Sequence, residues 1–262
     1  MDRKQRLQHR HGVLPDPGFR PGDTALLVID LQYGDAHPEH GLLRRMRERG
    51  DEEIADYYVD RLETLVIPNV RRLQDACREA GIEVIHTKIE SLTDDGRDRS
   101  LEHKRLNIHH PPGSIDARFR EEVAPVGDEI VLTKTCGGVF NGTNIEYVLR
   151  NLGIANLIVA GVITSGCVEV AVRDGADRGF SVTLAEDACA SWSEEMENAA
   201  IRAMSEIYAK VLSTEEIVSL VRAEMAMPTA FPSGWPDGDA PPTAFAETSS
   251  GGRSGDSREH ST

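Results

Sequence analysis

Short apolar runs and helix-patterned segments alternate along most of this chain, and that alternation limits the possible fold more than any other feature. The runs lie at residues 24–30, 83–88, 129–134, 157–162, 180–186 and 209–212. Such runs are typical of strands buried on both faces, in a parallel sheet that helices cover on both sides. The helices are expected over 54–80 with a break or kink at Pro68, and over 144–152, 167–179, 194–208 and 214–225. The sequence therefore predicts an α/β fold of three αβα layers, with a Rossmann-like parallel sheet of about six strands.

The two ends of the 262-residue chain differ in composition from its middle. Residues 1–22 are rich in Arg, His, Pro and Gly and contain no apolar core of a signal peptide, so we interpret them as an N-terminal extension. Residues 226–262 are rich in Pro, Gly, Ser and Asp without periodicity, which is typical of a disordered tail. Residues 23–225 are then expected to form one domain.

Charge and cysteine content narrow the functional classes. A net charge of -15 argues against a nucleic-acid partner, because binding to phosphates needs a basic surface. No apolar run approaches the roughly 18 residues that a membrane span requires. The four cysteines (Cys77, Cys136, Cys167 and Cys189) form no CxxC pair and no disulfide framework. We expect a soluble cytoplasmic protein that acts on a small molecule and has no nucleic-acid or membrane partner.

Cys167 follows the most apolar of the runs at a place where a nucleophile is often found. After residues 157–162 comes a small polar turn, and Cys167 then opens a helical pattern. A cysteine at the start of a helix can use the helix dipole to favour its thiolate, and free N–H groups can bind an oxyanion. Taken alone, a single cysteine is more often a small packing residue, so the interpretation depends on its neighbours.

Asp30 and Lys134 supply those neighbours, because each ends a predicted strand. The carboxyl ends of parallel strands lie at one edge of the sheet, so Asp30, Lys134 and Cys167 are expected to converge. Asp30 would take the proton of Cys167 and return it to the leaving group, while Lys134 would hold the two anions together. The product would be a thioester acyl-enzyme that water hydrolyses. Considered singly, Asp30 is also compatible with a turn cap and Lys134 with a solvated strand end.

Four segments resemble the isochorismatase-like cysteine hydrolases, a family that includes nicotinamidases, N-carbamoylsarcosine and ureidoacrylate amidohydrolases, and biuret and triuret hydrolases. They are TALLVIDLQ around Asp30, VIHTKIESL ending at Leu92, TKTCGGVFNGTNIEYVLRNLGI from Thr133, and AGVITSGCVEVAVRDGADRGF from Ala160. The resemblance implies the isochorismatase-like hydrolase fold and an Asp30–Lys134–Cys167 triad. It also implies a cis peptide bond between Val162 and Ile163, an oxyanion hole made by the N–H groups of Ile163 and Cys167, and a homo-oligomer (dimer or tetramer).

The chain departs from the nicotinamidase branch at the metal ligands. Nicotinamidases bind zinc through an acid and a DWH…H cluster after the second strand, whereas residues 87–91 here are Thr-Lys-Ile-Glu-Ser. His86 falls within the predicted strand, and His109 and His110 are expected at the loop surface or the pocket wall. We therefore predict no metal and no cofactor. Isochorismatases proper cleave a vinyl ether and some lack the cysteine, so the presence of Cys167 favours C–N hydrolysis.

Two irregular segments are expected to border the site. Residues 31–50 are predicted to form a polar loop, and residues 89–127 a long excursion that looks like the substrate loop of the ureide-cleaving branch. In the latter, Glu90 would accept hydrogen bonds from urea N–H groups, and Arg97 or Arg99 would hold a carbonyl or carboxylate group. The alternative for these three is a surface salt bridge or a loop-ordering role. The weaker substrate-binding candidates are Gln32, Tyr33, Phe140, Asn141 and Thr164. Of these, Phe140 is equally compatible with a position in the core.

These observations predict a cofactor-free cysteine amidohydrolase that cleaves a small amide or ureide of the biuret, triuret, ureidoacrylate or N-carbamoyl type. An isochorismatase-type ether hydrolase and a nicotinamidase that lost its metal are the alternatives on the same scaffold. A thiol-based redox sensor or a catalytically silent binding module is the alternative from another class. A sensor needs a reactive thiol but no carboxylate that returns a proton, so Asp30 and Lys134 separate these hypotheses.

Overall fold

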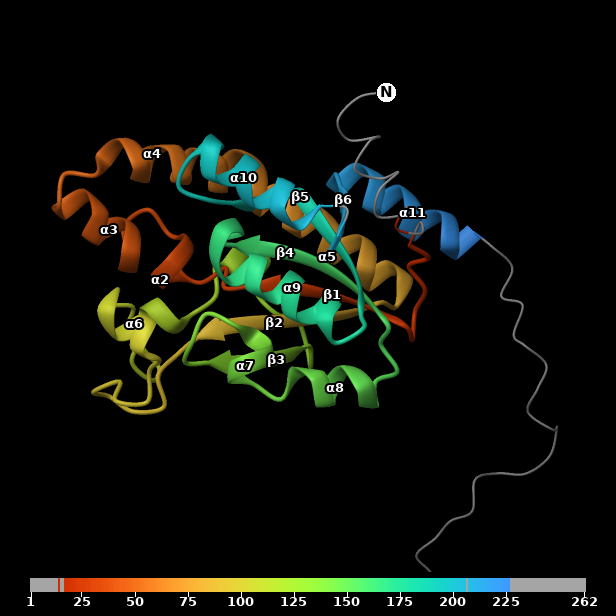
Figure 1. The fold of residues 1–262 in the computed structure, drawn as a ribbon, viewed down its shortest axis with the longest axis horizontal. Helices are drawn as coiled ribbons and strands as arrows, with labels where there is room; N and C mark the ends of the chain where they lie inside the picture. Colours follow the sequence, from red (N-terminus) through yellow and green to blue (C-terminus); the bar gives the residue numbers. More distant parts are fainter. Residues whose placement is uncertain (1–13, 15–16, 206, 227–262) are drawn as a thin grey trace, which may run out of the picture. The chain divides into compact units, whose positions relative to one another are not determined.

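The computed structural model describes residue 14 and residues 17–205 and 207–226, and its centre is a six-stranded parallel sheet (Figure 1). The predicted strand number, direction and αβα layering are confirmed. The sheet order is β3-β2-β1-β4-β5-β6. In chain order, the strands are β1 (Thr24–Ile29), β2 (Glu83–Ile89), β3 (Ile130–Lys134), β4 (Asn156–Val162), β5 (Ser181–Ala190) and β6 (Lys210–Leu212).

The chain reverses its direction of travel across the sheet between β1 and β4. It moves outward from β1 to β2 and β3, returns to place β4 on the other side of β1, and then continues to β5 and β6. In open α/β sheets, ligands bind outside the carboxyl ends of the strands at this switch point. In Figure 1 those ends point toward the left of the view, where α2 (Tyr33–Ala36), α3 (Gly41–Glu48) and α6 (Leu101–Arg105) lie.

Two apolar clusters cover the two faces of the sheet and explain the continuous apolar pattern of β1. Leu26 and Val28 point into one cluster, together with residues of α5 (Ile67–Ala80) and α11 (Thr214–Ala226). Leu27 and Ile29 point into the other, together with residues of α8 (Ile145–Asn151) and α9 (Glu169–Asp177). Successive side chains of a strand point to opposite faces, so a strand covered on both sides must be apolar throughout. The remaining helices are α4 (Glu52–Arg61), α7 (Val139–Gly142) and α10 (Glu194–Met204).

The break expected at Pro68 takes the form of a π-helical turn. Residues Leu62–Val66 form this turn between α4 and α5, and Pro68 stands at the start of α5. Proline has no N–H group and its ring displaces the carbonyl one turn earlier, so the hydrogen-bond ladder must change there.

None of the helices in the described ranges is long and apolar enough to cross a membrane.

Several predicted boundaries were wrong. The polar loop expected over 31–50 contains α2 and α3, and α3 packs through the buried Leu43. Strand β5 extends to Ala190 rather than ending near 186, because a register shift opposite β4 lets Cys189 and Ala190 pair with it, and residues 188–190 are buried. Helix α10 ends at Met204 instead of 208.

The excursion over 89–127 is largely irregular, as expected, and includes α6 and two short 3₁₀ turns, Ile115–Ala117 and Glu121–Val123. The expected N-terminal extension and C-terminal tail fall almost wholly outside the described residues.

Candidate active site

Asp30, Lys134 and Cys167 meet at the carboxyl edge of the sheet, beside the switch point. The Nζ atom of Lys134 lies 2.7 Å from Asp30 Oδ2 and 3.4 Å from Cys167 Sγ. A third contact, of 3.1 Å to the carbonyl oxygen of Cys136, fixes the ammonium group further. Asp30 and Lys134 are only 1% and 0% exposed, so their charges are held in a desolvated environment where electrostatic contacts are strong.

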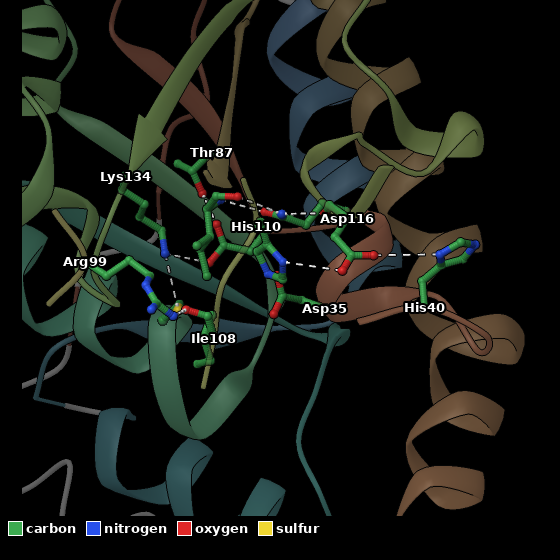
Figure 2. A network of polar contacts seen from close by, with 12 residues as sticks. Asp35, His40, Thr87, Arg99, Ile108, His110, Asp116 and Lys134 are labelled. Carbon is green, nitrogen blue, oxygen red and sulfur yellow. Dashed lines mark hydrogen bonds and ion pairs between the residues drawn. The ribbon is translucent and has the colours of Figure 1, made fainter. Parts of the chain in front are cut away.

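Asp30 is oriented by both its backbone and its second carboxylate oxygen. It adopts a left-handed backbone conformation (φ 53°), which is uncommon outside glycine and clusters at functional sites. Its N–H group donates to the carbonyl of Thr87, and the Thr87 hydroxyl donates to Asp30 Oδ1 over 2.8 Å (Figure 2 labels Thr87 and Lys134). One oxygen of the carboxylate is thus bound by Thr87 while the other faces Lys134.

The protonation states of this cluster follow from burial and charge. Burial alone would lower the pKa of Lys134, but Asp30 and Cys167 raise it well above its usual range, so the lysine is a permanent cation. Burial raises the pKa of the Cys167 thiol, Lys134 opposes this effect, and the charge of Asp30 adds to it, leaving the pKa well above normal. The helix start and the lysine, which both favour the thiolate, therefore do not offset the effect of burial on the thiol pKa. Because Cys167 keeps its proton at neutral pH, it needs a neighbouring base.

The elbow that carries Cys167 depends on a close approach between β1 and β4. The Val162–Ile163 peptide bond is cis, and a π-helical turn over Thr164–Val168 leads from it into α9. Gly161 has a φ of +117°, and a Cβ atom there would stand 2.2 Å from the carbonyl oxygen of Ile29. Only glycine fits this position, a requirement that we did not infer from the sequence.

Two of the proposed substrate-binding residues use all their side-chain donor groups within the protein. The side-chain amide of Gln32 donates to the carbonyls of Ile89 and Asp116, and its oxygen accepts from the N–H group of Ile89. Thr164 is fully buried and donates to Glu197 Oε1 over 2.7 Å. Gln32 ties the end of β2 to the 89–127 segment, and Thr164 ties the elbow to α10, so the structure favours a positioning role for both.

The charged candidates of the substrate loop serve to order that loop. Glu90 pairs with Lys88 at 2.7 Å and accepts from the N–H group of Gly113. Arg97 is largely exposed and pairs with Asp95, and Arg99 donates to the carbonyls of Gly96 and Ile108. The loop-ordering alternative is the one that these contacts support.

The three remaining substrate-binding candidates lie in the core, on the surface and in an aromatic cluster. Phe140 is part of the core, where it packs against Phe180 with ring centroids 5.9 Å apart. Asn141 is exposed and donates to Asp174. Tyr33 is partly buried and stacks on His37 with centroids 4.6 Å apart. Phe140 is thus a packing residue, as the alternative reading held.

His110, expected at the loop surface or the pocket wall, is instead fully buried, in a polar network beside the triad whose carboxylates were not inferred from the sequence. Figure 2 shows His110 between two carboxylates. Its Nε2 atom lies 3.0 Å from Asp35 Oδ2, and its Nδ1 atom lies 3.9 Å from Asp116 Oδ2. His40 approaches Asp116 from the other side at 3.7 Å. A Cβ atom on Gly34 would stand 2.3 Å from the His110 ring, so glycine makes room for it. The sequence signals were the His109-His110 pair and a glycine and an acid shortly after Asp30.

The buried ion pair of Asp35 and His110 stabilises the charged form of both side chains. Burial opposes the charged form of each residue, but the ion pair and its hydrogen bond lower the pKa of Asp35 and raise that of His110. Together they hold the 89–127 segment against the chain that follows Asp30.

Within the residues described, no group of three or more His, Cys, Asp or Glu side chains is arranged to bind a metal ion.

Comparisons with known proteins agree with this geometry. The isochorismatase domain family matches residues 24–216. The chain is 32% identical over 120 residues to an N-carbamoylsarcosine amidase from Arthrobacter sp., a match that covers 44% of this chain and 46% of that relative. It is 27% identical over 191 residues to the ureidoacrylate amidohydrolase RutB of Rhizobium rhizogenes, covering 66% of this chain and 73% of that protein.

A solved structure shows the same fold. The cysteine hydrolase from Pseudomonas syringae pv. phaseolicola superimposes with a TM-score of 0.70 and 22% identity, covering 81% of this chain and 98% of that one. The family match takes in all six strands and the three converging residues, and it confirms the resemblance found in the sequence. The chain therefore belongs to the isochorismatase family.

Proposed function

We propose that this protein is a cysteine amidohydrolase that cleaves a C–N bond of a small amide or ureide. The observation that carries the proposal is the position of Lys134, whose ammonium group contacts both the Asp30 carboxylate and the Cys167 thiol. This arrangement joins a nucleophile, a base and a cation in one buried cluster. Relatives that are named as an amidase and an amidohydrolase support the same reaction class.

The first half of the reaction forms an acyl-enzyme. Asp30 accepts the thiol proton while Sγ of Cys167 attacks the carbonyl carbon of the substrate. The N–H groups of Ile163 and Cys167 bind the resulting oxyanion, and Lys134 keeps Asp30 and the sulfur oriented. Asp30 then gives the proton to the leaving nitrogen, the C–N bond breaks, and a thioester remains on Cys167.

The second half releases the acid. Asp30 accepts a proton from a water molecule, and the hydroxide attacks the thioester carbonyl. The C–S bond breaks, and the proton on Asp30 returns to the sulfur. The sum is one amide and one water converted to one acid and one amine or ammonia, with the enzyme regenerated. Because the pKa of Cys167 is raised by burial, both halves depend on Asp30 as proton carrier.

Within this class we propose a small polar substrate of the biuret, triuret, ureidoacrylate or N-carbamoyl type. We also propose that the protein acts in the cytoplasm as a homo-oligomer without a cofactor. The four cysteines are free, which suits a reducing compartment. Size-exclusion chromatography with light scattering measures the assembly state.

The test is ammonia release from a panel of biuret, triuret, an N-carbamoyl amino acid, ureidoacrylate, nicotinamide and an aliphatic amide. Release by the wild-type protein that is abolished in Cys167→Ala supports the proposal and identifies the substrate class. Cys77→Ala is the matched control, because this thiol is buried in α5 with its pKa raised to about 12 by burial and should not affect the reaction. Silence of the wild type across the whole panel would contradict C–N hydrolysis and favour an ether substrate.

A further inference from the structure

A small open space lies beside Gly137, between the nucleophile and a carboxylate. A Cβ atom built on Gly137 would stand 4.0 Å from Cys167 Sγ and 3.6 Å from Glu102 Oε2. Apart from the chain on either side of the glycine, no other atom of the described residues comes within 4 Å of that point. Both separations are ordinary van der Waals distances. The missing side chain of Gly137 thus leaves a space that the thiol and the carboxylate of Glu102 both border.

The carboxylate of Glu102 is free to bind a ligand. Glu102 is exposed, and within the described ranges its carboxylate makes no hydrogen bond or ion pair. The carboxylates of Glu90, Asp95 and Asp98, in the same 89–127 segment, each accept hydrogen bonds from the protein. Those three order the segment, whereas Glu102 keeps its acceptor oxygens available.

Helix α6, which carries Glu102, is fixed against the turn that follows β3. The N–H group of Ser100 donates to the carbonyl of Thr135 over 2.9 Å, and the Ser100 hydroxyl accepts from the N–H group of His103 over 3.1 Å. His103 is only 1% exposed, so the helix is packed down through the residue next to Glu102. Glu102 is therefore presented by an anchored helix, which favours a specific contact to a small ligand.

The triad itself supplies no charge that would balance Glu102. Lys134 contacts the sulfur, but its ammonium group already pairs with Asp30 at 2.7 Å. Cys167 is neutral at rest, because burial raises the pKa of its thiol. Glu102 thus adds a negative charge beside a neutral cluster. Such a charge attracts N–H donors and repels an anionic substrate.

We propose that Glu102 makes the protein selective for neutral, N–H-rich amides and ureides, by accepting a hydrogen bond from a substrate N–H group beside Gly137. This inference rests on the proposed function and narrows its substrate class to molecules like biuret and triuret. A carbonyl carbon ready for attack stands about 3–3.5 Å from the sulfur, so the nitrogen bonded to it enters the same space. Ureidoacrylate and N-carbamoyl amino acids carry a carboxylate, which brings a second negative charge to the site.

The experiment compares kcat/KM for biuret, which is neutral, and for an N-carbamoyl amino acid, which is anionic. The wild type should prefer biuret. Glu102→Gln keeps the length of the side chain and one acceptor oxygen but removes the charge. KM for biuret should then rise about tenfold, the effect of losing a charge-assisted hydrogen bond, and the preference over the anionic substrate should shrink. The matched control is Asp128→Asn, which removes the same charge from an exposed residue just before β3, at the end of that strand opposite Lys134. It should change neither KM.

Gly137→Ala tests the space itself. The added methyl group would contact the sulfur and the Glu102 carboxylate without overlapping them, so Tm should stay close to that of the wild type. The methyl group would occupy the place assigned to the substrate, so KM for biuret should rise. A KM that stays unchanged in this variant would contradict the assigned place.

The outcomes separate this inference from the proposed function. If the wild type hydrolyses biuret and Glu102→Gln keeps its KM, the inference is overturned while the proposed function stands. A higher kcat/KM for the anionic substrate than for biuret in the wild type would overturn it in the same way. A loss of Tm in Glu102→Gln that accompanies its loss of activity would indicate a structural role and also overturn it. A wild type that hydrolyses no panel member removes the proposed function itself, and the inference with it.

Discussion

Lys134 shows how a single side chain can organise a reaction centre. It is fully buried, yet it is charged, because Asp30 and the sulfur of Cys167 both lie within reach of its ammonium group. A buried charge without a partner would be strongly destabilising, so the lysine and the carboxylate depend on each other. The sulfur gains from this arrangement only when it becomes an anion, which is the moment of attack.

Removal of either partner should reduce the reactivity of Cys167. We expect Asp30→Asn to slow alkylation of Cys167 by iodoacetamide at pH 7, because the loss of the base outweighs the loss of the Asp30 charge, which by itself raises the pKa of the thiol. Lys134→Ala should act in the same direction, since the lysine lowers the pKa of a thiol that burial has raised. Peptide mass spectrometry measures the modification, with the buried Cys189 as internal reference. Unchanged rates in both variants would contradict the triad and favour a redox-sensing thiol.

At the scale of elements, the site depends on how closely β1 and β4 approach each other. Gly161 permits this contact where β4 passes the carbonyl of Ile29, one residue before Asp30. The elbow and the catalytic carboxylate are therefore positioned by the same pair of neighbouring strands. A change in their spacing would move Asp30 and Cys167 relative to each other.

Gly161→Ala tests this contact. The new Cβ atom would overlap the Ile29 carbonyl in addition to the cost of a positive φ, so we expect a loss of about 3 kcal/mol in the free energy of unfolding and a loss of activity. Gly179→Ala is the matched control: its φ is +82°, and no atom lies within 4 Å of the added Cβ. It should cost about 1 kcal/mol and keep activity. Equal effects of the two substitutions in chemical denaturation would show that the strand contact is unimportant.

The Asp35–His110 pair makes the attachment of the 89–127 segment dependent on pH. The pKa of His110 is raised above its ordinary value of 6.5, so its contribution is complete below pH 6.5 and is lost as the pH rises through the raised value. The pKa of Asp35 is lowered from 3.8, so its contribution is present above that pH and is lost only in stronger acid. Stability should therefore decline as the pH rises above 6.5 and through the raised pKa of His110.

Asp35→Asn should lower stability at pH 6 on the order of 3 kcal/mol and flatten that decline with rising pH, because the buried imidazolium loses the nearer of its two carboxylates. Tm measured from pH 6 to pH 9 checks this expectation. Asp95→Asn, which breaks the exposed pair with Arg97, is the control and should leave the pH profile unchanged. A wild-type Tm that stays constant over this range would refute the role of the pair.

The elements that the sequence predicted well are those that local patterns encode. Buried strands need unbroken apolar runs, and a parallel sheet brings their carboxyl ends together, so Asp30, Lys134 and Cys167 could be expected to converge. Helices α2 and α3 were missed because they are short, and their stability comes from tertiary packing around residues such as Leu43. The functions of Gln32 and Glu90 depend on hydrogen bonds to distant backbone groups, which no local pattern reveals.

At the scale of the whole molecule, the sheet order explains why residues so far apart in sequence form one site. β1 lies between β2 and β4, so Asp30 has Thr87 on one side and the elbow on the other. Lys134 reaches it from β3, two strands away. The site is thus shared by both halves of the doubly wound sheet, and neither half contains a complete set of groups.

This strand order also has a consequence for synthesis on the ribosome. β1 is made early, but one of its two neighbours, β4, is completed only at Val162. Until then, the N-terminal half of the nascent chain exposes one edge of β1, a strand that is buried along its whole length in the folded protein, and such an edge pairs readily with other chains. The interval between translation of Ile29 and of Val162 is therefore one in which the nascent chain is open to incorrect strand pairing.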